Sequence, residues 1–535
     1  MPNKLTNGLA SLMVLQSFTV FPEYFISVSI IYVLIVIVLV TYNVYGLMLQ
    51  KAVSECIALM LFMACYLIIN DDLIAFNFSI FNHSIVNDYF AFFTKIVVCF
   101  SSSLYFLIIA DSLKEQRLTS FEYLLITLFA VLGLMLLCSS NDLLTAYLAI
   151  ELSSLSFYIL ASFKKTSSYS VEGGIKYFIT GAVSSAFFLL GSSFIYGVTG
   201  SINFTDFFDL FEFSKLYQFP WIFYVLDDTP SNLAHAWILW WLMTNAEFFD
   251  YNFAELGVTL ILFSLFIKLA LAPFHLWSLD VYEGSPTSST FFFAVISKLS
   301  IFVLLVRLCY ISFFDIKSCW QFYSLWVGVF SIFVGSFGGL KQRKLKTLLA
   351  YSSTSHMGYA LIAFSSSTYL GVQMLFFYLI IYILAGLSTW SIILSLRLKK
   401  KGLDSKYNKE LGDLVLLRKS NVALALAFAL TMFSIAGIPP LIGFLAKMSV
   451  FLSVVGISFY FIALTAILCS VVSTFYYIRI IKVLFFENNI VGKLYYPIQS
   501  DKTLILSILV FLLVFFFTNP TLVYLLNYKI ILSLT

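Results

Sequence analysis

The sequence predicts an all-α polytopic membrane protein with about fourteen transmembrane helices, and three observations support this prediction. Of its 535 residues, 61% are hydrophobic and 11% are charged, whereas soluble domains have roughly 45–50% apolar and about 25% charged residues. Apolar runs of about 20 residues, the length that crosses a bilayer, follow one another along most of the chain. The charges between the runs alternate in sign, as expected for a chain that crosses a membrane repeatedly.

Each expected helix is assigned to one apolar run that is long enough to span the bilayer. In chain order, the expected helices cover 24–48, 52–70, 88–110, 120–139, 142–163, 174–197, 254–279, 288–312, 321–340, 344–365, 369–396, 421–450, 452–484 and 502–528. The loop 200–256 is the one large insertion, and its apolar run at 236–243 is too short to span. We expect that run to lie in the membrane interface, where tryptophan-rich segments are common.

The charges of the loops test this count. Loops after odd-numbered helices hold most of the basic residues, namely Lys51, Lys114, Arg117, Lys164, Lys165, Lys341–Lys346, Lys399–Lys401, Lys406, Lys409, Lys482 and Lys493. Loops after even-numbered helices are acidic or neutral, and loop 200–256 carries Lys215 as its one basic residue. Since one missed helix would scramble this alternation, the loops support fourteen helices and place both termini opposite the basic loops.

Several classes of function are excluded by the composition. The net charge of +4 is too small to indicate a nucleic-acid partner. The seven cysteines are scattered without metal-ligand spacing, so the sequence predicts neither a metal site nor a disulfide framework. No glycine-rich nucleotide-binding motif is present. The lipid bilayer is therefore the first partner that the composition predicts.

Four charged residues lie deep inside apolar runs: Glu151, Lys268, Lys298 and Lys447. A charge at the middle of a transmembrane helix costs roughly 2.5–3.5 kcal/mol, so such residues usually face a cavity or a partner. A buried lysine tends to lose its proton, while a nearby carboxylate opposes that loss. We therefore interpret the four residues as a proton relay in which Glu151 modulates Lys268. We expect Lys95, which is isolated in the third helix, to reach the membrane surface with its long side chain.

Two of the expected helices are interrupted. Pro273 breaks the seventh helix shortly after Lys268, and Gly437, Pro439 and Pro440 break the twelfth before Lys447. Broken backbone at membrane depth is tolerated against protein or a water-filled cavity. Two such helices, five apart in order, suggest internal repeats with ion sites where the broken helices meet.

The repeats divide the chain into four parts. We expect an N-terminal extension with three helices at 1–119, a first five-helix repeat at 120–313, a second at 314–485 and a C-terminal part at 486–535. Three further residues are weaker candidates for the relay: His275 and His356, because imidazole titrates near neutral pH, and Lys176 near the start of the sixth helix. Each has a structural alternative, a hydrogen-bonded helix-end residue.

Five segments of the sequence resemble the antiporter-like membrane subunits of respiratory complex I. They are LLTAYLAIELSSLSFY (143–158), EGGIKYFITGAVSSAFFLLGSSFIYGVTG (172–200), FIKLALAPFHLWSLDVYEGSPT (266–287), LKTLLAYSSTSHMGY (345–359) and FSIAGIPPLIGFLAKMSVF (433–451). The resemblance implies fourteen helices with two inverted five-helix repeats and two discontinuous helices. It also implies a proton-translocating subunit whose partners are other membrane-arm subunits of the complex.

Position by position, the resemblance assigns roles to five residues. Glu151 matches the carboxylate of the fifth helix, Lys176 the lysine of the sixth, and Lys268 the lysine of the first broken helix. Lys298 matches the central lysine and Lys447 the lysine of the second broken helix. NADH, FMN, iron–sulfur clusters and ubiquinone would bind to other subunits, so the resemblance implies no cofactor in this chain.

The location follows from the resemblance and the composition. The 59 phenylalanines and 32 tyrosines suggest an AT-rich organellar gene, which favours a multi-pass protein of the mitochondrial inner membrane. The basic loops would then face the matrix, and the termini would face the intermembrane space. A bacterial or plastid origin remains an alternative at this stage.

Three other functions compete with this interpretation. A subunit of a multisubunit cation/proton antiporter would share the repeats and the lysines, although the segments YEGSPT and GIPPLIGF favour complex I. An intramembrane enzyme, such as an acyltransferase, would need a nucleophile and a base in one motif, and neither His275 nor His356 lies in one. A structural spacer would not need four buried charges.

Overall fold

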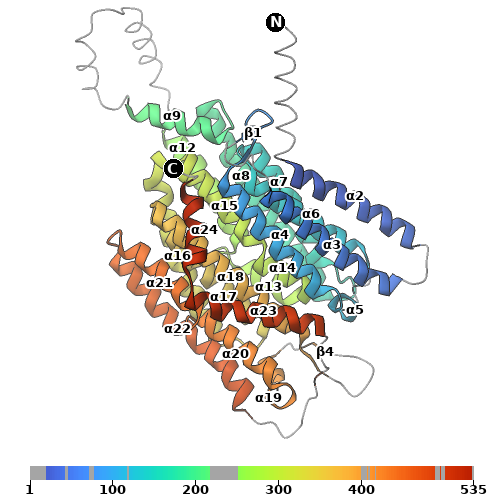
Figure 1. Ribbon diagram of the computed structural model, residues 1–535. Helices are drawn as coiled ribbons and strands as arrows, with labels where there is room; N and C mark the ends of the chain where they lie inside the picture. Colours follow the sequence, from blue (N-terminus) through green and yellow to red (C-terminus); the bar gives the residue numbers. More distant parts are fainter. Residues whose placement is uncertain are drawn as a thin grey trace, which may run out of the picture.

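The computed structural model describes residues 20–532, except for 42–45, 71–77, 117, 119, 217–250, 399–405, 408–409, 416, 488–494 and 496–499. The predicted interfacial segment 236–243 and the basic residues Lys399–Lys401 and Lys493 lie outside the described residues. The protein is a bundle of membrane-length helices (Figure 1). Helices α2–α4 lie at one edge and α20–α22 at the other, with α14, α15 and α18 between them (Figure 1).

The first half of the described chain is α2 Phe21–Thr41, α3 Gly46–Ile69, α4 Tyr89–Ile109, α5 Ser112–Glu115, α6 Glu122–Ser139, α7 Leu143–Ser162, α8 Ser168–Thr199, α9 Phe204–Leu216, α12 Tyr251–Leu269, α13 Leu276–Gly284, α14 Thr287–Val295 and α15 Ser297–Val306. The second half is the π-helical turn η3 Arg307–Ser312, the 3₁₀ turn η4 Phe314–Ile316, α16 Lys317–Gly339, α17 Leu345–Phe364, α18 Tyr369–Ser395, the 3₁₀ turn η5 Leu411–Leu414, α19 Leu417–Ser420, α20 Val422–Ala436, α21 Ile442–Val455, α22 Tyr460–Phe485, α23 Ser500–Thr518 and α24 Thr521–Leu532.

Twelve helical stretches in the described part of the chain are long and apolar enough to cross a membrane. They include the continuous stretch Thr287–Ser312, which is 94% buried, and the N-terminal Phe21–Leu39. Two shorter apolar helices, α20 and α21, follow each other around the break at 437–441. The predicted class, a polytopic helical membrane protein, is confirmed, whereas the count of fourteen spans stays a prediction.

The two predicted interruptions are present in the structure. Between α12 and α13 the chain leaves the helix at Ala270, which has a positive φ of 57°, and Pro273 follows. Between α20 and α21, Gly437 has a φ of 81° and caps α20, because its amide bonds to the carbonyls of Phe433 and Ser434. Glycine adopts this left-handed conformation without a steric penalty.

Two further breaks were not predicted. The expected eighth helix divides at Ile296 into α14 and α15 and ends in the π-helical turn η3. The expected last helix divides into α23 and α24 at Asn519 and Pro520. The structure also adds two short antiparallel hairpins to the all-α prediction, β1 Phe78–Ile80 with β2 Ile85–Asn87, and β3 Arg397–Leu398 with β4 Lys406–Tyr407.

Helices pack closely in pairs where small residues meet. An added Cβ on Gly133 of α6 would lie 2.9 Å from the Ser153 amide nitrogen of α7, and one on Gly191 of α8 would lie 2.6 Å from the Gly257 carbonyl of α12. Small residues at such contacts let the backbones of transmembrane helices approach each other.

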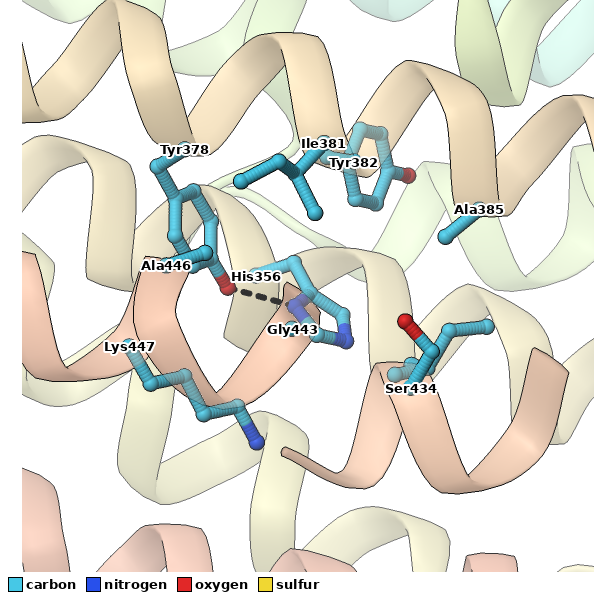
Figure 2. Close-up of a pocket in the computed structure, with 10 residues that line it drawn as sticks. His356, Tyr378, Ile381, Tyr382, Ala385, Ser434, Gly443, Ala446 and Lys447 are labelled. Atoms are coloured by element: carbon cyan, nitrogen blue, oxygen red, sulfur yellow. Dashed lines mark hydrogen bonds between the residues drawn. The ribbon is translucent and has the colours of Figure 1, made fainter. Parts of the chain in front are cut away.

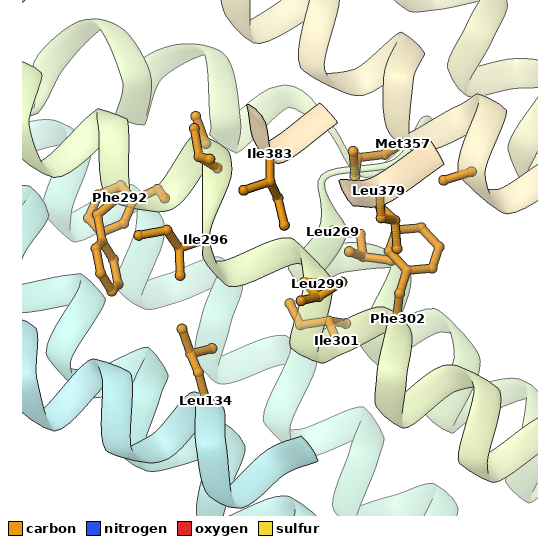
Figure 3. Close-up of a cluster of buried hydrophobic side chains, with 14 of the residues drawn as sticks. Leu134, Leu269, Phe292, Ile296, Leu299, Ile301, Phe302, Met357, Leu379 and Ile383 are labelled. Carbon is orange, nitrogen blue, oxygen red and sulfur yellow. The ribbon is translucent and has the colours of Figure 1, made fainter. Parts of the chain in front are cut away.

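The middle of the bundle is apolar on all sides. Around Phe292 of α14 and Leu299 of α15, apolar side chains of other helices enclose the chain, among them Leu134 of α6, Leu269 of α12, Met357 of α17 and Ile383 of α18 (Figure 3). Polar groups inside this layer therefore depend on one another rather than on surrounding solvent.

Candidate functional site

Lys447 lies at the second helix break. It is on α21, it is buried, and its Nζ donates a 2.7 Å hydrogen bond to the carbonyl oxygen of Ala436, at the end of α20. The break frees that carbonyl from the helical hydrogen-bond ladder, so it can accept a bond from the amine. The side chain of Lys447 passes over Gly437, where an added Cβ would lie 2.8 Å from the lysine Cδ.

A cavity lies beside this lysine. Its wall includes His356 of α17, Tyr378 and Tyr382 of α18, Ser434 of α20 and Lys447 (Figure 2). It leaves about 20 Å³ for the centres of water molecules, and one water needs roughly 10–15 Å³ on that measure. The Ser434 hydroxyl has no hydrogen-bond partner among the described residues. The cavity therefore has polar groups in a largely apolar wall and has room for a water molecule.

His356 joins two tyrosines at this cavity. Its Nδ1 lies 2.5 Å from the Tyr378 hydroxyl, as the dashed line in Figure 2 shows, and its Nε2 lies 3.1 Å from the Tyr477 hydroxyl of α22. Imidazole can accept a proton at one nitrogen while it releases one from the other. The arrangement connects α17, α18 and α22 through groups that can exchange protons.

Lys298 lies at the start of α15, and it is buried. Its Nζ donates a 3.3 Å hydrogen bond to the Tyr382 hydroxyl and lies 5.4 Å from the centre of the tyrosine ring. Tyr382 in turn donates to the carbonyl oxygen of Ala294 at 2.9 Å. Because Tyr382 also lines the Lys447 cavity, one side chain separates the amine of Lys298 from that cavity.

Lys268 and Glu151 lie on α12 and α7, which both pack against α8, and both residues are partly exposed at the surface of this chain. The Nζ of Lys268 donates to the Tyr158 hydroxyl at 3.3 Å and lies 5.8 Å from the centre of that ring. Glu151 forms no ion pair with Lys268 within the described residues, and its Oε1 is buried without a hydrogen-bond partner there. The two charges act on each other across space rather than in direct contact.

The weaker candidates are placed differently. Lys176 is 44% exposed, on the outer face of α8, and pairs with Glu172 and with Asp280 of α13 at 2.7 Å each. His275 lies in the first helix break, and its ring is 6.3 Å from that of Tyr351. Neither residue is beside the cavity of Lys447.

The expectation for Lys95 was wrong. Its side chain is 3% exposed and forms an ion pair with Glu23 of α2, so it does not reach the membrane surface. This partner could not be predicted from the sequence, because Glu23 lies just before the first expected helix.

Three tyrosines of the site were missed by sequence reasoning. Each lysine places its Nζ over one ring: Lys268 over Tyr158, Lys298 over Tyr382 and, at 5.5 Å, Lys447 over Tyr359. With 32 tyrosines in the chain, an isolated tyrosine in an apolar helix does not stand out. Tyr158 and Tyr359 do end two of the segments that carry the family resemblance.

An ion pair outside the membrane-spanning helices lies at the basic end of the site. Lys344, just before α17, bonds to Glu283 of the YEGSPT segment, and this bond raises the pKa of the Lys344 amine. Lys346 donates to the Ser285 carbonyl oxygen at 2.7 Å. These contacts join the end of α13 to the start of α17. Within the described residues, no group of three His, Cys, Asp or Glu side chains could hold a metal ion.

Comparisons with known proteins agree with this geometry. The family described as NADH:quinone oxidoreductase/Mrp antiporter, transmembrane region, matches residues 140–473. The chain is 34% identical to NADH-ubiquinone oxidoreductase chain 2 of Marchantia polymorpha, over 85% of each protein. It is 33% identical to NADH-quinone oxidoreductase subunit N of Pelagibacter ubique, over 88% of this chain and 90% of that one.

Solved structures share the fold. A chain of respiratory complex I from Thermus thermophilus superimposes with a TM-score of 0.71 at 25% identity, covering 94% of this chain and 98% of that one. A chain of the Mrp complex from Dietzia superimposes with a TM-score of 0.73 at 17% identity, covering 97% of each.

Proposed function

The chain belongs to the NADH:quinone oxidoreductase/Mrp antiporter transmembrane family, and we propose that it is a proton-translocating subunit in the membrane arm of respiratory complex I. Its partners are the other membrane-arm subunits and the lipid bilayer. It takes part in the NADH:ubiquinone reductase reaction by moving protons while other subunits carry the redox cofactors. Curated relatives along 75–88% of this chain are NADH-ubiquinone or NADH-quinone oxidoreductase subunits.

One observation carries the proposal: Lys298 and Lys447 are buried in the apolar middle of the bundle without an acidic partner among the described residues. Their nitrogens bond to a hydroxyl and a carbonyl oxygen instead. A permanently charged lysine at this depth would cost roughly 2.5–3.5 kcal/mol, so each is suited to take up and release a proton. A structural role alone would be served by an apolar side chain.

The proton steps follow from the contacts. A proton on Lys298 can pass through the Tyr382 hydroxyl, or through a water beside it, to the cavity of Lys447, where His356 offers a second carrier. Glu151 and Lys268 form the input switch, because the carboxylate stabilises the charged amine and a change in their separation alters that stabilisation. Quinone reduction elsewhere in the complex supplies the change.

The finer architecture belongs to the same proposal. The bundle comprises fourteen spans, with inverted repeats at 120–313 and 314–485, each containing one discontinuous helix. The breaks at Pro273 and at Gly437, Pro439 and Pro440 support this division, since inverted repeats place ion sites where discontinuous helices meet. The protein is encoded in an organelle and resides in the mitochondrial inner membrane, which the NADH-ubiquinone oxidoreductase chain 2 relatives of Marchantia polymorpha and Arabidopsis thaliana support.

A subunit of a cation/proton antiporter is the second candidate, because the Mrp chain shares the fold. The two functions are separated by the partners that the chain keeps during purification. In complex I it copurifies with flavin-containing subunits and NADH:quinone reductase activity. In an antiporter it does not, and vesicles that contain it exchange Na⁺ for protons without NADH.

Two substitutions test the relay. We expect Glu151→Gln and Lys268→Met to lower coupled NADH:ubiquinone turnover and proton pumping by about tenfold each, since general acid–base groups contribute about a hundredfold or more where they act directly. Oxidation of NADH by an artificial acceptor such as ferricyanide should be unchanged, because it does not use the membrane arm. Assembled complexes of both variants that pump at the normal rate would contradict the proposed relay.

A further inference from the structure

A second set of buried charges lies outside the relay. It consists of four side chains that we call the charge quartet: Glu23 of α2, Asp88 at the N-terminus of α4, Lys95 of α4 and Arg307 at the start of η3. Glu23 pairs with Lys95, and the Arg307 Nη2 donates to the Asp88 Oδ1 at 2.6 Å. The four side chains are 1–7% exposed. Two cations and two anions make the quartet neutral.

The two ion pairs are joined to each other through the chain. The Nζ of Lys95 donates a 2.6 Å hydrogen bond to the Oδ1 of Asn87, the residue before Asp88. Asp88 also accepts the Ala91 amide at 2.8 Å and so caps α4. The position of the Asp88 carboxylate is therefore fixed from both sides, by the helix that it caps and by the Glu23–Lys95 pair behind it.

Arg307 is held by two helices, α4 and α6. Besides Asp88, its Nε donates to the Cys138 carbonyl oxygen of α6 at 3.2 Å, and its guanidinium lies 5.3 Å from the ring centre of Phe90 in α4. Phe90 packs edge to face on Phe376 of α18, the helix that also carries Tyr382. A planar guanidinium with several donors suits such a fixed, multidentate position.

The segment that Arg307 ends is the one that carries Lys298. Helix α15 is ten residues long, Ser297–Val306, and is bounded by the break at Ile296 and by the π-helical turn η3. Lys298 lies near its first end, and Arg307 follows its last residue, about 13 Å along the axis at 1.5 Å per residue. At Ile296 the backbone stays in the right-handed helical region, with φ −85° and ψ −42°, so α15 follows α14 directly. At the other end η3 is a π-helical turn, and π-turns are frequent at functional sites. The contacts of Arg307 therefore hold the end of α15 that α14 does not.

We propose that Arg307 is a positioning residue for the Lys298 proton carrier. The charge quartet holds the end of α15 against α4 and α6, and this keeps the Lys298 amine at the Tyr382 hydroxyl. Helices α2 and α4, which lie before the family-matched region 140–473, thereby take part in proton transfer without carrying a proton. The proposal rests on the proposed function, in which Lys298 is a carrier.

A role in stability alone is the competing explanation. A neutral buried ion-pair network is often replaceable by apolar side chains with little loss of stability. Stability therefore does not explain why these charges lie at the end of the Lys298 segment. The two explanations differ in what happens to turnover once the charges are removed together.

The test uses the double variant Asp88→Asn/Arg307→Met in the assembled complex. It removes both charges of one pair, so no lone charge is left buried, and asparagine keeps the cap of α4. We expect coupled turnover, measured as kcat, to fall about tenfold, because distant positioning residues alter function by about two- to thirtyfold. The KM for ubiquinone should be unchanged, and so should the rate of ferricyanide reduction. The single variant Arg307→Lys, which keeps Asp88, should have a higher kcat than the double variant, since the lysine amine can still donate to the Asp88 carboxylate.

Two controls separate positioning from other effects. Lys502→Met, on α23 and far along the chain from α15, removes a buried cation that pairs with Asp111 before α5, and it should leave kcat unchanged. In a Lys298→Met background, the double variant should have no further effect, because a positioning residue acts through the residue that it positions.

Three results would overturn the proposal. They are a normal kcat in the assembled double variant, a loss of kcat in the Lys298→Met background as large as in the unmodified background, and a loss of kcat in Lys502→Met as large as in the double variant. If the double variant does not assemble, the single variants Lys95→Gln and Arg307→Lys replace it in the same turnover assay. A normal kcat in both of them would overturn the proposal. Normal pumping by Lys298→Met alone would instead contradict the proposed function, so the two failures are distinguishable.

Discussion

At the residue scale, the three relay lysines, Lys268, Lys298 and Lys447, each face one tyrosine ring and bond to one oxygen. The ring attracts the amine when it is charged, while the hydroxyl or carbonyl oxygen accepts its hydrogen bond in both protonation states. The contacts are thus neither as strong as an ion pair nor absent. A proton carrier needs this balance, because a salt bridge would hold the proton and an apolar pocket would reject it.

Lys298 offers the sharpest test of that balance. Lys298→Met keeps the length of the side chain but cannot carry a proton, so we expect coupled turnover to fall by about tenfold or more in an assembled complex. Lys298→Arg should also fail, for a different reason, since a guanidinium does not release its proton near neutral pH.

Proton uptake by reconstituted complexes measures both effects, with ferricyanide reduction as the control for the hydrophilic subunits. An arginine variant that pumps normally would show that Lys298 acts only through its charge. A methionine variant that pumps normally would exclude Lys298 as a carrier.

The sequence predicted the charged residues of the site better than their partners. A lysine in an apolar run stands out by its cost, so Lys298 and Lys447 could be identified without a structure. Three tyrosines could not be identified in this way, namely Tyr158, Tyr359 and Tyr382. Tyrosine is common in apolar helices, and the partner of its hydroxyl is determined by packing. Glu23 was missed because it lies at the end of an apolar run, where charges are usual, whereas Arg307 lies inside the expected helix 288–312 and was not singled out.

At the element scale, the interruptions at Pro273 and at Pro439–Pro440 were predicted, whereas those at Ile296 and at Asn519–Pro520 were not. Pro273 and the Pro439–Pro440 pair remove backbone donors and mark their breaks in the sequence. The break at Ile296 has no glycine or proline, and neither has the π-helical turn Arg307–Ser312, whose first residue bonds to Asp88. The chain was therefore read as one continuous eighth helix.

The contact between α7 and α8 positions the partner of Lys268. An added Cβ on Gly181 of α8 would lie 1.7 Å from the Tyr158 hydroxyl oxygen. We expect Gly181→Ala to displace the Tyr158 ring from the Lys268 amine and to lower coupled turnover by about ten- to a hundredfold, as misplacement by about 1 Å can do.

Gly197→Ala is the matched control, because Gly197 lies in the same helix and has no atom within 4 Å of an added Cβ. Its turnover should equal that of the unmodified complex. Restoration of turnover in Gly181→Ala by Tyr158→Phe would argue against the tyrosine hydroxyl as the partner that matters, since that hydroxyl would then be dispensable.

At the scale of the whole molecule, charge separates the two ends of the bundle. Helix α9 lies at one end and carries Asp206 and Asp209, while α5, with Lys114, and α19, with Arg418 and Lys419, lie at the other (Figure 1). The separation is the one that the loop charges predict from sequence. Basic loops are retained on the side from which a membrane protein is inserted, which in the inner membrane of mitochondria is the matrix.

The orientation can be checked with trypsin, because loop 200–256 contains Lys215 as its single lysine and no arginine. With α9 on the intermembrane-space side, trypsin added to mitoplasts should release an N-terminal fragment that ends at Lys215. Sites in the basic loops, such as Lys344 before α17, should be cut only after detergent opens the inner membrane, together with a matrix marker protein. The reverse order of cleavage, with Lys344 cut first in intact mitoplasts, would show that the bundle has the opposite orientation in the membrane. The sides assigned to proton uptake and release would then exchange as well, because the YEGSPT segment and Lys344 lie at the same end.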